Sequence, residues 1–166
     1  MKVAVIGTGR VGLPFALSLM DAGVSVMGVD LDPRIRQAVN VDREMPFHEP
    51  GFDELLSSGK LHIVASVAEA ADCDCFVVTV GTPLLAHIET DLSLVTNVIT
   101  SLCERLRPGQ LIVMRSTTAP RTTQYVASLI ETRTRLKVGK DVFLSGCAEL
   151  AGESNAREER LSLAQI

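Results

Sequence analysis

A glycine-rich turn near the start of the chain constrains the possible folds more than any other feature of the sequence. Glycines at positions 7, 9 and 12 form the pattern G-x-G-x-x-G, which directly follows the apolar run 2–6. Helical spacing of apolar residues begins beside it, over 10–22. In this context Gly7 allows a tight bend, Gly9 leaves the backbone open to a pyrophosphate, and Gly12 lets helix and strand pack closely. The sequence therefore predicts a phosphate-binding turn.

A carboxylate follows the next apolar run, 24–29. Asp30 can accept hydrogen bonds from both ribose hydroxyls of adenosine, and it would repel a 2′-phosphate. We therefore predict NAD as the cofactor, in preference to NADP. The alternatives are a turn that binds no ligand, with Asp30 only capping a helix, and a 2′-phosphate held by Arg34 or Arg36. The predicted contacts in this part of the chain are Gly7, Gly9, Arg10, Val11, Gly12, Asp30 and Arg34.

The remaining sequence alternates between short apolar runs and segments with helical spacing. Strands are expected at 2–6, 24–29, 61–65, 75–80, 110–115 and 142–145, and helices at 10–22, 33–40, 52–58, 66–71, 92–106 and 122–132. Asp32 and Pro33 suit the cap and first position of the second helix, the prolines of 42–51 indicate a loop, and the charged stretch 155–160 suggests a solvated helix. This alternation predicts an α/β fold of the Rossmann type, a doubly wound parallel sheet with helices on both faces.

Size and composition narrow the class of protein. The chain has 166 residues, 46% apolar and 22% charged, with a net charge of −4, which fits one globular domain. Acidic and basic residues are interspersed, so we expect no nucleic-acid partner. No apolar run approaches the roughly 20 residues that span a bilayer, and the sequence opens directly into a strand without a secretion signal. We expect a cytoplasmic protein that does not associate with a membrane.

The four cysteines, at 73, 75, 103 and 147, do not form a metal-binding pattern with the three scattered histidines. We therefore predict no metal site and reduced, mostly buried thiols. Cys73 and Cys75 flank one residue of a predicted strand, so their side chains are expected to point the same way.

Later motifs in the chain resemble the UDP-glucose/GDP-mannose dehydrogenase family, NAD-dependent enzymes that oxidise the C6 alcohol of a nucleotide sugar to a carboxylate. The resemblance covers the family's N-terminal domain. It is carried, in order, by Gly12-Leu13-Pro14, Pro46-Phe47-His48-Glu49-Pro50-Gly51, Val80-Gly81-Thr82-Pro83, Asp91-Leu92-Ser93, Arg115-Ser116-Thr117-Thr118-Ala119-Pro120 and Cys147-Ala148-Glu149 with Glu153. Ala148 stands where the family has proline, and Arg121 replaces a glycine that is common after Pro120.

The resemblance implies roles for residues that follow the strands, at the sheet edge where α/β proteins bind ligands. Thr117 would orient a water or a substrate oxygen. Glu149 would act as, or position, the general base, and Glu153 would lie against the nicotinamide. These three are the candidate catalytic residues. The further cofactor contacts implied are Val80, Gly81, Thr82, Pro83, Ser116, Thr117 and Glu153.

The resemblance implies that a nucleophilic cysteine, a lysine and an asparagine would lie in sequence beyond residue 166, and Cys147 matches the first position of the last motif instead. We expect an NAD-binding domain at 1–146, followed at 147–166 by the start of the segment that leads to a central helix and a C-terminal domain. A sugar nucleotide would be bound mainly by that domain, and a homodimer would form in the full-length protein. The 166 residues alone are then expected to be inactive.

Two alternatives remain open at this stage. The chain could be a stand-alone NAD-binding or regulatory module without catalysis. It could also be a dehydrogenase of the hydroxyisobutyrate or phosphogluconate type, which shares the glycine turn. The loop at Glu49-Pro50-Gly51 and the pairing of Ser116-Thr117 with Glu149 argue against the second of these.

Overall fold

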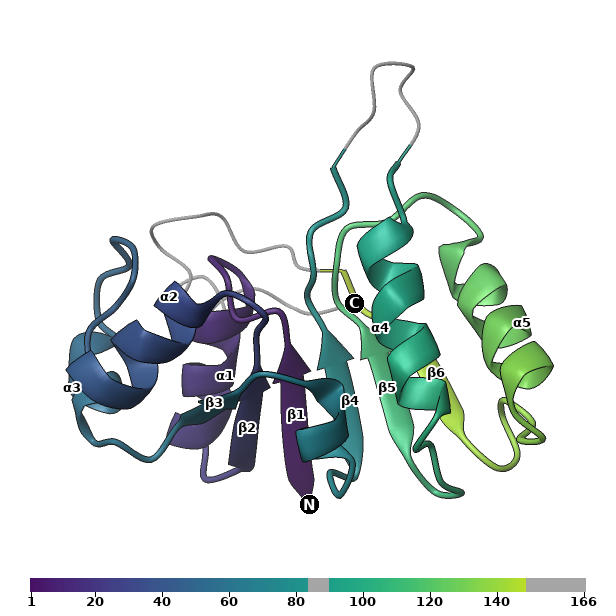
Figure 1. Cartoon of the computed structure of the whole chain (residues 1–166), viewed down its shortest axis with the longest axis horizontal. Coiled ribbons are helices and arrows are strands. Elements are labelled where there is room, and N and C mark those ends of the chain that lie inside the picture. The colour runs from purple at the N-terminus through teal and green to yellow at the C-terminus, as the bar shows by residue number, and fades with distance from the viewer. Residues whose placement is uncertain (84–89, 149–166) are drawn as a thin grey trace.

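A computed structural model describes residues 1–83 and 90–148 of the chain. Its centre is a six-stranded parallel sheet with the strand order β3-β2-β1-β4-β5-β6 (Figure 1). The strands are β1 (Lys2–Ile6), β2 (Ser25–Val29), β3 (His62–Val64), β4 (Cys75–Val78), β5 (Leu111–Met114) and β6 (Phe143–Gly146). The order reverses between β1 and β4, as it does in doubly wound dinucleotide-binding sheets. The predicted fold class is confirmed.

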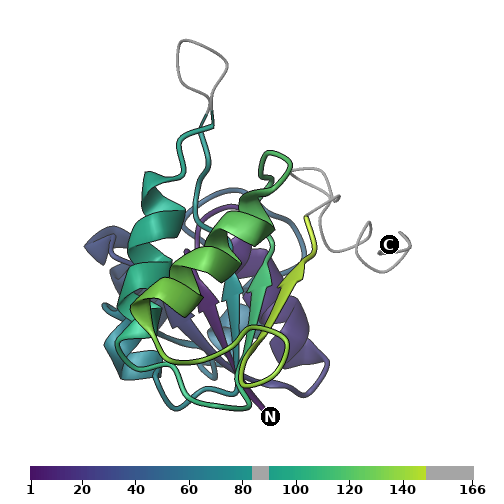
Figure 2. The ribbon, with the colours of Figure 1, turned by 90° about the vertical axis from the view of Figure 1, so that its right-hand side faces the viewer.

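Helices cover both faces of this sheet (Figures 1 and 2). The helical segments are α1 (Gly12–Asp21), α2 (Pro33–Gln37), the π-helical turn η1 (Ala38–Asp42), α3 (Asp53–Ser57), the 3₁₀ turn η2 (Val67–Ala70), α4 (Ser93–Cys103) and α5 (Thr122–Arg133). Buried residues of α4 and α5 pack on one face of the sheet, and those of α1 and α3 pack on the other. Two apolar layers therefore enclose the strands.

Most predicted elements occur where the sequence placed them, with ends that differ by a few residues. The cap of α2 is as expected, because the Asp32 carboxylate accepts a hydrogen bond from the Arg34 amide at 2.9 Å and Pro33 follows the cap. The predicted strand 75–80 is shorter, because β4 ends at Val78, although the Thr79 amide still donates to the Ile6 carbonyl of β1 at 2.9 Å. The helix expected at 155–160 lies outside the described residues.

The helix predicted at 33–40 does not continue as an α-helix. It widens into η1, and there the Asn40 side chain pairs with the outer edge of β3. Its amide nitrogen donates to the Ile63 carbonyl at 2.8 Å, and its oxygen accepts from the Ile63 amide at 2.9 Å. The Asn40 amide thus substitutes for a neighbouring strand at the sheet edge, where unpaired backbone groups otherwise invite association.

The expectation that Cys73 and Cys75 point the same way is wrong. Cys73 precedes β4, which begins at Cys75, so the alternation of a strand does not apply to it. Cys73 packs with the α4 and α5 layer, and Cys75 packs with the α1 layer. Burial raises the pKa of the Cys73 thiol and raises that of Cys75 to about 11, so both remain protonated at neutral pH.

A buried glutamine connects two turns at the amino-terminal edge of the sheet. The Gln110 side chain is 5% exposed. Its amide nitrogen donates to the carbonyls of Ala71 and Cys73 at 3.1 and 2.8 Å, and its oxygen accepts from the Arg107 amide at 2.7 Å. One side chain therefore satisfies three backbone groups that the sheet ladder does not reach.

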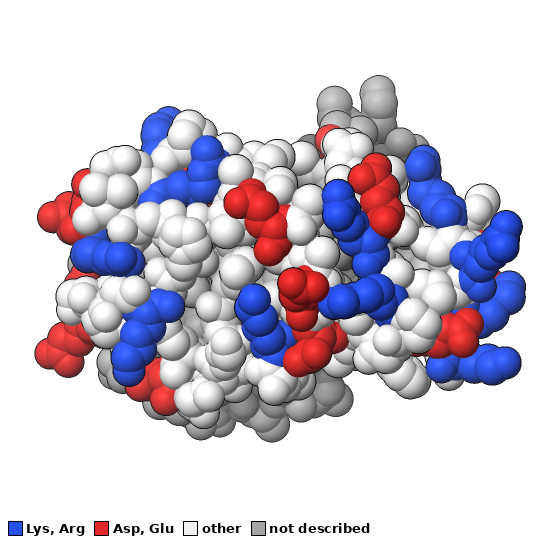
Figure 3. Space-filling view, turned by 60° about the horizontal axis from the view of Figure 1, so that its bottom comes forward, with Lys and Arg blue, Asp and Glu red and all other residues white. Residues whose placement is uncertain are grey.

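Charged side chains of both signs alternate on the face of the molecule that includes this edge (Figure 3). Within residues 1–83 and 90–148, no helix combines the length and the apolar character needed to cross a membrane.

We predict that Gln110→Met lowers the free energy of unfolding by about 2 kcal/mol, because methionine fills a similar volume but leaves buried backbone groups without partners. Chemical denaturation measures the change. Gln124→Met is the matched control, since Gln124 is exposed on α5. Equal effects of the two substitutions would show that the Gln110 hydrogen bonds do not stabilise the fold.

Candidate functional site

The glycine turn lies at the carboxyl-terminal edge of the sheet, between β1 and α1. Gly7 has φ +92°, and its amide donates to the Val29 carbonyl at 2.8 Å. A Cβ added at Gly12 would lie 2.0 Å from the Gly7 carbonyl oxygen and 2.5 Å from the Thr79 hydroxyl oxygen. The predicted role of Gly12, close packing of α1 against the turn, is what the geometry requires.

Gly9 differs from these two glycines in the space around it. Among residues 1–83 and 90–148, no atom would lie within 4 Å of a Cβ added at Gly9. The backbone here is open on the side of the cavity described below, and α1 starts directly afterwards, with the Leu13 amide donating to the Gly9 carbonyl at 2.9 Å. The first amides of a helix carry partial positive charge and lack internal partners. A pyrophosphate fits both the free space and the charge.

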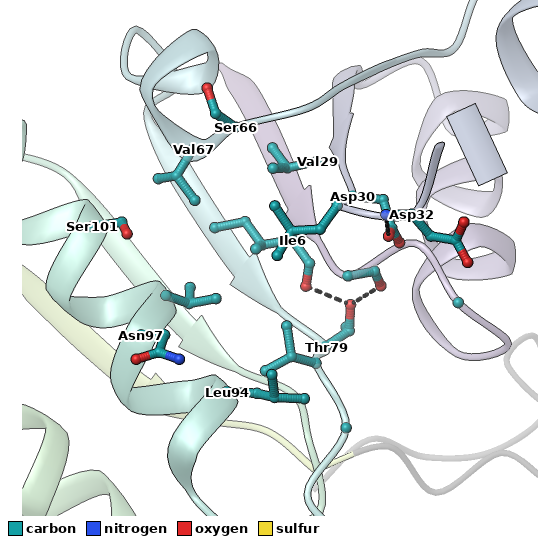
Figure 4. Close-up of a pocket in the computed structure, with 16 residues that line it drawn as sticks. Ile6, Val29, Asp30, Asp32, Ser66, Val67, Thr79, Leu94, Asn97 and Ser101 are labelled. Atoms are coloured by element: carbon teal, nitrogen blue, oxygen red, sulfur yellow. Dashed lines mark hydrogen bonds between the residues drawn. The ribbon is translucent and has the colours of Figure 1, made fainter. Parts of the chain in front are cut away.

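Thr79, at the end of β4, holds the turn from the neighbouring strand. Its hydroxyl lies 3.0 Å from the Ile6 carbonyl oxygen and 2.7 Å from that of Gly7, and both contacts are drawn in Figure 4. The sequence did not single out Thr79, because this contact joins segments about 70 residues apart. Its position after an apolar strand was the available signal.

Asp30 follows β2 and lies across the turn from Gly9. One carboxylate oxygen accepts from the Thr8 amide at 2.7 Å and from the Thr8 hydroxyl at 3.1 Å. The other accepts from the Asp32 amide at 2.9 Å. The carboxylate is therefore held at the edge of the sheet by three donors. Of its roughly four lone-pair positions, one remains for a ligand.

A cavity of about 530 Å³ lies beside the turn, between the ends of β1, β2 and β4 and the helix α4 (Figure 4). It is lined by Ile6, Gly7, Gly9, Val29, Asp30, Leu31, Asp32, Ser66, Val67, Thr79, Val80, Gly81, Leu94, Asn97, Val98 and Ser101. Apolar side chains form most of the wall, and the carboxylates of Asp30 and Asp32 lie at one side. An apolar cavity with a few fixed polar groups suits a flat base attached to a hydroxylated sugar.

Five predicted cofactor contacts line this cavity, namely Gly7, Gly9, Asp30, Val80 and Gly81. Gly12 packs against the Gly7 carbonyl of the turn, and Val11 is the residue before α1; neither lines the cavity. The Arg10 guanidinium lies over the Phe47 ring, 5.7 Å from its centre. Arg10 is therefore in contact with the Pro46–Gly51 loop motif, on the outer side of the turn.

Arg34 is not among the residues that line the cavity. Its guanidinium pairs with the Asp32 carboxylate at 2.7 Å, and its side chain is 89% exposed. This partner lowers the pKa of Asp32 to about 2. Arg36 donates to the Asp30 carbonyl at 2.7 Å. Both arginines that could hold a 2′-phosphate are thus engaged locally in the structure.

The residues expected after β4 and β5 connect two loops. The Thr82 hydroxyl donates to the Thr117 carbonyl at 2.5 Å, and the Ser116 hydroxyl donates to the Val80 carbonyl at 2.7 Å. Ser116 is buried, whereas Thr117 and Pro83 are exposed. Ser116 uses its proton within the protein, so it can meet a ligand only as an acceptor. Glu149 and Glu153 lie outside the described residues.

Arg115 is a buried cation at this edge that sequence reasoning did not assign to the site. It is 5% exposed, its guanidinium lies 4.3 Å from the centre of the Phe15 ring, and it donates to the Cys147 sulfur at 3.4 Å. An arginine directly after an apolar strand was the signal. Cys147 therefore lies against a cation at the ends of β5 and β6.

Arg121 begins α5 with φ +72°, a left-handed conformation that side chains disfavour by roughly 1–2 kcal/mol. The family that the chain resembles commonly has glycine at this position, and glycine adopts the same backbone conformation without that cost. The departure noted in the sequence is thus a strained residue next to the Ser116-Thr117 loop.

Together, the strand order 3-2-1-4-5-6, the glycine turn at the start of α1 and the acid after β2 define a dinucleotide-binding Rossmann domain. The NAD-binding domain of the UDP-glucose/GDP-mannose dehydrogenase family matches residues 1–166, and the chain belongs to this family. NAD is the cofactor of that domain. The open space at Gly9 and the carboxylate of Asp30 fit its pyrophosphate and its adenosine ribose.

Relatives of the chain are dehydrogenases of nucleotide sugars. It is 32% identical over 153 residues to UDP-N-acetyl-D-mannosamine dehydrogenase of Pyrococcus horikoshii, covering 90% of this chain and 36% of the relative. It is 36% identical over 135 residues to UDP-glucose 6-dehydrogenase of Pseudomonas aeruginosa, covering 78% and 30%. A GDP-mannose dehydrogenase structure from Pseudomonas aeruginosa has a TM-score of 0.90 at 29% identity, covering 96% of this chain and 38% of the other. The chain spans about a third of the length of these relatives.

We predict that Gly9→Val abolishes NAD binding and leaves the melting temperature nearly unchanged, because the added side chain occupies only the space that the pyrophosphate needs. Gly12→Ala should instead destabilise the fold by about 3 kcal/mol, since its Cβ meets the Gly7 carbonyl. Calorimetric titration and thermal unfolding measure the two effects. A folded Gly9→Val protein that binds NAD as tightly as the parent contradicts this placement of the pyrophosphate.

Proposed function

We propose that this chain is the NAD-binding part of a nucleotide-sugar 6-dehydrogenase, which oxidises the C6 alcohol of a UDP- or GDP-linked sugar to a carboxylate. The observation that carries the proposal is the combination of an open backbone at Gly9 with a fixed carboxylate at Asp30, on one cavity, in a chain of this family. The names of its relatives support the class of substrate.

Within this proposal, the remaining acceptor position of Asp30 receives one ribose hydroxyl of adenosine, and the apolar wall around Val67 and Val98 receives the adenine ring. The amides at Gly9 and the start of α1 receive the pyrophosphate. Bound NAD supplies a hydride acceptor for the alcohol carbon of the sugar. The loops tied together by Thr82 and Ser116 lie at the ends of β4 and β5, where they shape the nicotinamide end of the site.

The catalytic roles proposed for this chain fall at its last strands. Thr117 is exposed after β5 and would orient a water or a substrate oxygen. Glu149, as base or positioning group, and Glu153, beside the nicotinamide, are proposed from the motif alone. We propose residues 1–146 as the NAD-binding domain and 147–166 as the start of a connection to further domains. Those domains would bind the nucleotide sugar and form the interface of a homodimer.

One observation favours a second candidate, a stand-alone NAD-binding module without catalysis. Ala148 stands beside Glu149 where the family has proline, and such a change is easier to tolerate when no chemistry depends on the backbone there. Sequencing the gene beyond codon 166 separates the two. A cysteine in a glycine-rich loop there supports the enzyme, and its absence supports the module.

We predict that the chain binds NAD more tightly than NADP, and that Asp30→Ala weakens NAD binding about tenfold while removing the preference, because it deletes both the ribose acceptor and the charge that repels a 2′-phosphate. Titration calorimetry with each cofactor measures this. Asp72→Ala is the matched control, since Asp72 is exposed at the opposite edge of the sheet. Tighter binding of NADP by the parent chain would refute the selectivity.

We predict that the 166-residue chain does not oxidise UDP-glucose, UDP-N-acetylmannosamine or GDP-mannose at saturating NAD. Hydride transfer requires the alcohol carbon to be held about 3–3.5 Å from its acceptor, which a cofactor domain alone does not achieve. A full-length protein should reduce two NAD for each acid formed, because an alcohol loses two hydride equivalents on the way to a carboxylate. Absorbance of NADH measures both. Steady NADH production by the short chain would mean that the catalytic groups lie within it, and Cys147 would be tested first.

A further inference from the structure

Thr8, the first variable residue of the glycine turn, is completely buried although it is polar. Its backbone amide and its hydroxyl both donate to the same oxygen of Asp30, at 2.7 and 3.1 Å. A single residue of the phosphate-binding turn therefore supplies two of the three donors that hold the carboxylate at the adenosine end of the cavity. The turn and the acid are joined by a side chain and not only by their places in the fold.

The methyl group of Thr8 is held on its other side by β2. A Cβ added at Gly28 would lie 3.0 Å from the Thr8 Cγ2 and 2.8 Å from the Ile63 Cγ1. Gly28 thus leaves the space into which this methyl group packs. Since a β-branched side chain has few rotamers, a fixed methyl group also fixes the direction of the hydroxyl. Thr8 therefore packs against Gly28 on one side and donates to Asp30 on the other.

The direction of the Asp30 carboxylate matters because cations lie close by. Arg34 is paired with Asp32, and Arg36 donates to the Asp30 carbonyl. An exposed ion pair such as that of Arg34 is easily broken. If the carboxylate turned away from the ribose position, these arginines would offer a 2′-phosphate favourable partners. Discrimination against a 2′-phosphate then depends on how firmly the carboxylate is held.

We propose that Thr8 is a positioning residue that sets the selectivity for NAD over NADP through Asp30. This inference rests on the proposed binding of NAD at this cavity. Thr8 does not need to touch the cofactor with its side chain. Its hydroxyl keeps the one free lone pair of Asp30 aimed at a ribose hydroxyl and keeps the negative charge where a 2′-phosphate would lie.

The test compares Thr8→Val, which keeps the shape and removes the hydroxyl, with Thr8→Ser, which keeps the hydroxyl and removes the methyl group. Dissociation constants for NAD and for NADP are measured by titration calorimetry at one ionic strength, together with the melting temperature. Thr8→Val should lower the ratio of NADP to NAD dissociation constants about tenfold, as expected for the loss of one hydrogen bond to a charged group. Thr8→Ser should lower the ratio less than Thr8→Val does, because it keeps the hydroxyl and loses only the methyl group that restricts its direction.

If Thr8→Val does not fold, Thr8→Ala replaces it, because alanine also lacks the hydroxyl. Its ratio of dissociation constants is then compared with that of Thr8→Ser. A ratio unchanged in both the valine and the alanine variants overturns the inference, because a purely structural residue alters stability and not selectivity. An equal loss of selectivity in the serine variant also overturns it, by assigning the effect to the methyl group. A parent chain that binds neither cofactor refutes the proposed function itself, an outcome that is distinct from the other two.

Discussion

The contact between Gly12 and the Gly7 carbonyl is the constraint on which the site depends. No side chain fits there, so α1 begins directly against the turn that precedes it. The Thr79 hydroxyl touches the same carbonyl from the neighbouring strand β4. The turn is thereby fixed from two sides, and its open side faces the cavity at Gly9. Close packing at Gly12 holds the turn in place, and this leaves the space at Gly9 open toward the cavity.

The functional edge is assembled from segments that contribute little individually. Asp30 is held by a residue of the turn, Ser116 by the end of β4, and Thr82 by the loop after β5. Each hydrogen bond joins two of the loops that follow parallel strands. Because the loops restrain one another, groups distant in sequence acquire fixed positions before any ligand arrives, which reduces the entropy cost of binding.

The sequence predicts most of the fold because its signals are local. Apolar runs such as Cys75–Val78 identify buried strands, and Asp32 with Pro33 identifies the start of α2. The glycine turn and Asp30 were found in the same way, since spacing and strand ends suffice to place them. The strand order was not predicted from the sequence, because it depends on which distant strands pair.

What the sequence missed depends on contacts between distant segments. Leu94 and Asn97 line the cavity because α4 lies beside it, and Thr79 lines it because β4 ends next to the turn. No local pattern marks these residues. The opposite orientations of the two cysteines followed from where β4 starts, a boundary that patterns place only within a few residues. The buried position of Arg115 likewise depends on Phe15 of α1, a hundred residues earlier.

The two edge strands of the sheet, β3 and β6, differ in whether a side chain pairs with their outer backbone groups. On β3, Asn40 occupies both backbone groups of Ile63, so an approaching strand would find no free ladder there. On β6, which has no further strand beside it among the described residues, Phe143 is 47% exposed. Growth of the sheet, whether by another part of the same polypeptide or by unwanted self-association at high concentration, is therefore directed to β6. We therefore expect an isolated version of this domain to gain more solubility from changes at Phe143 than from changes at β3.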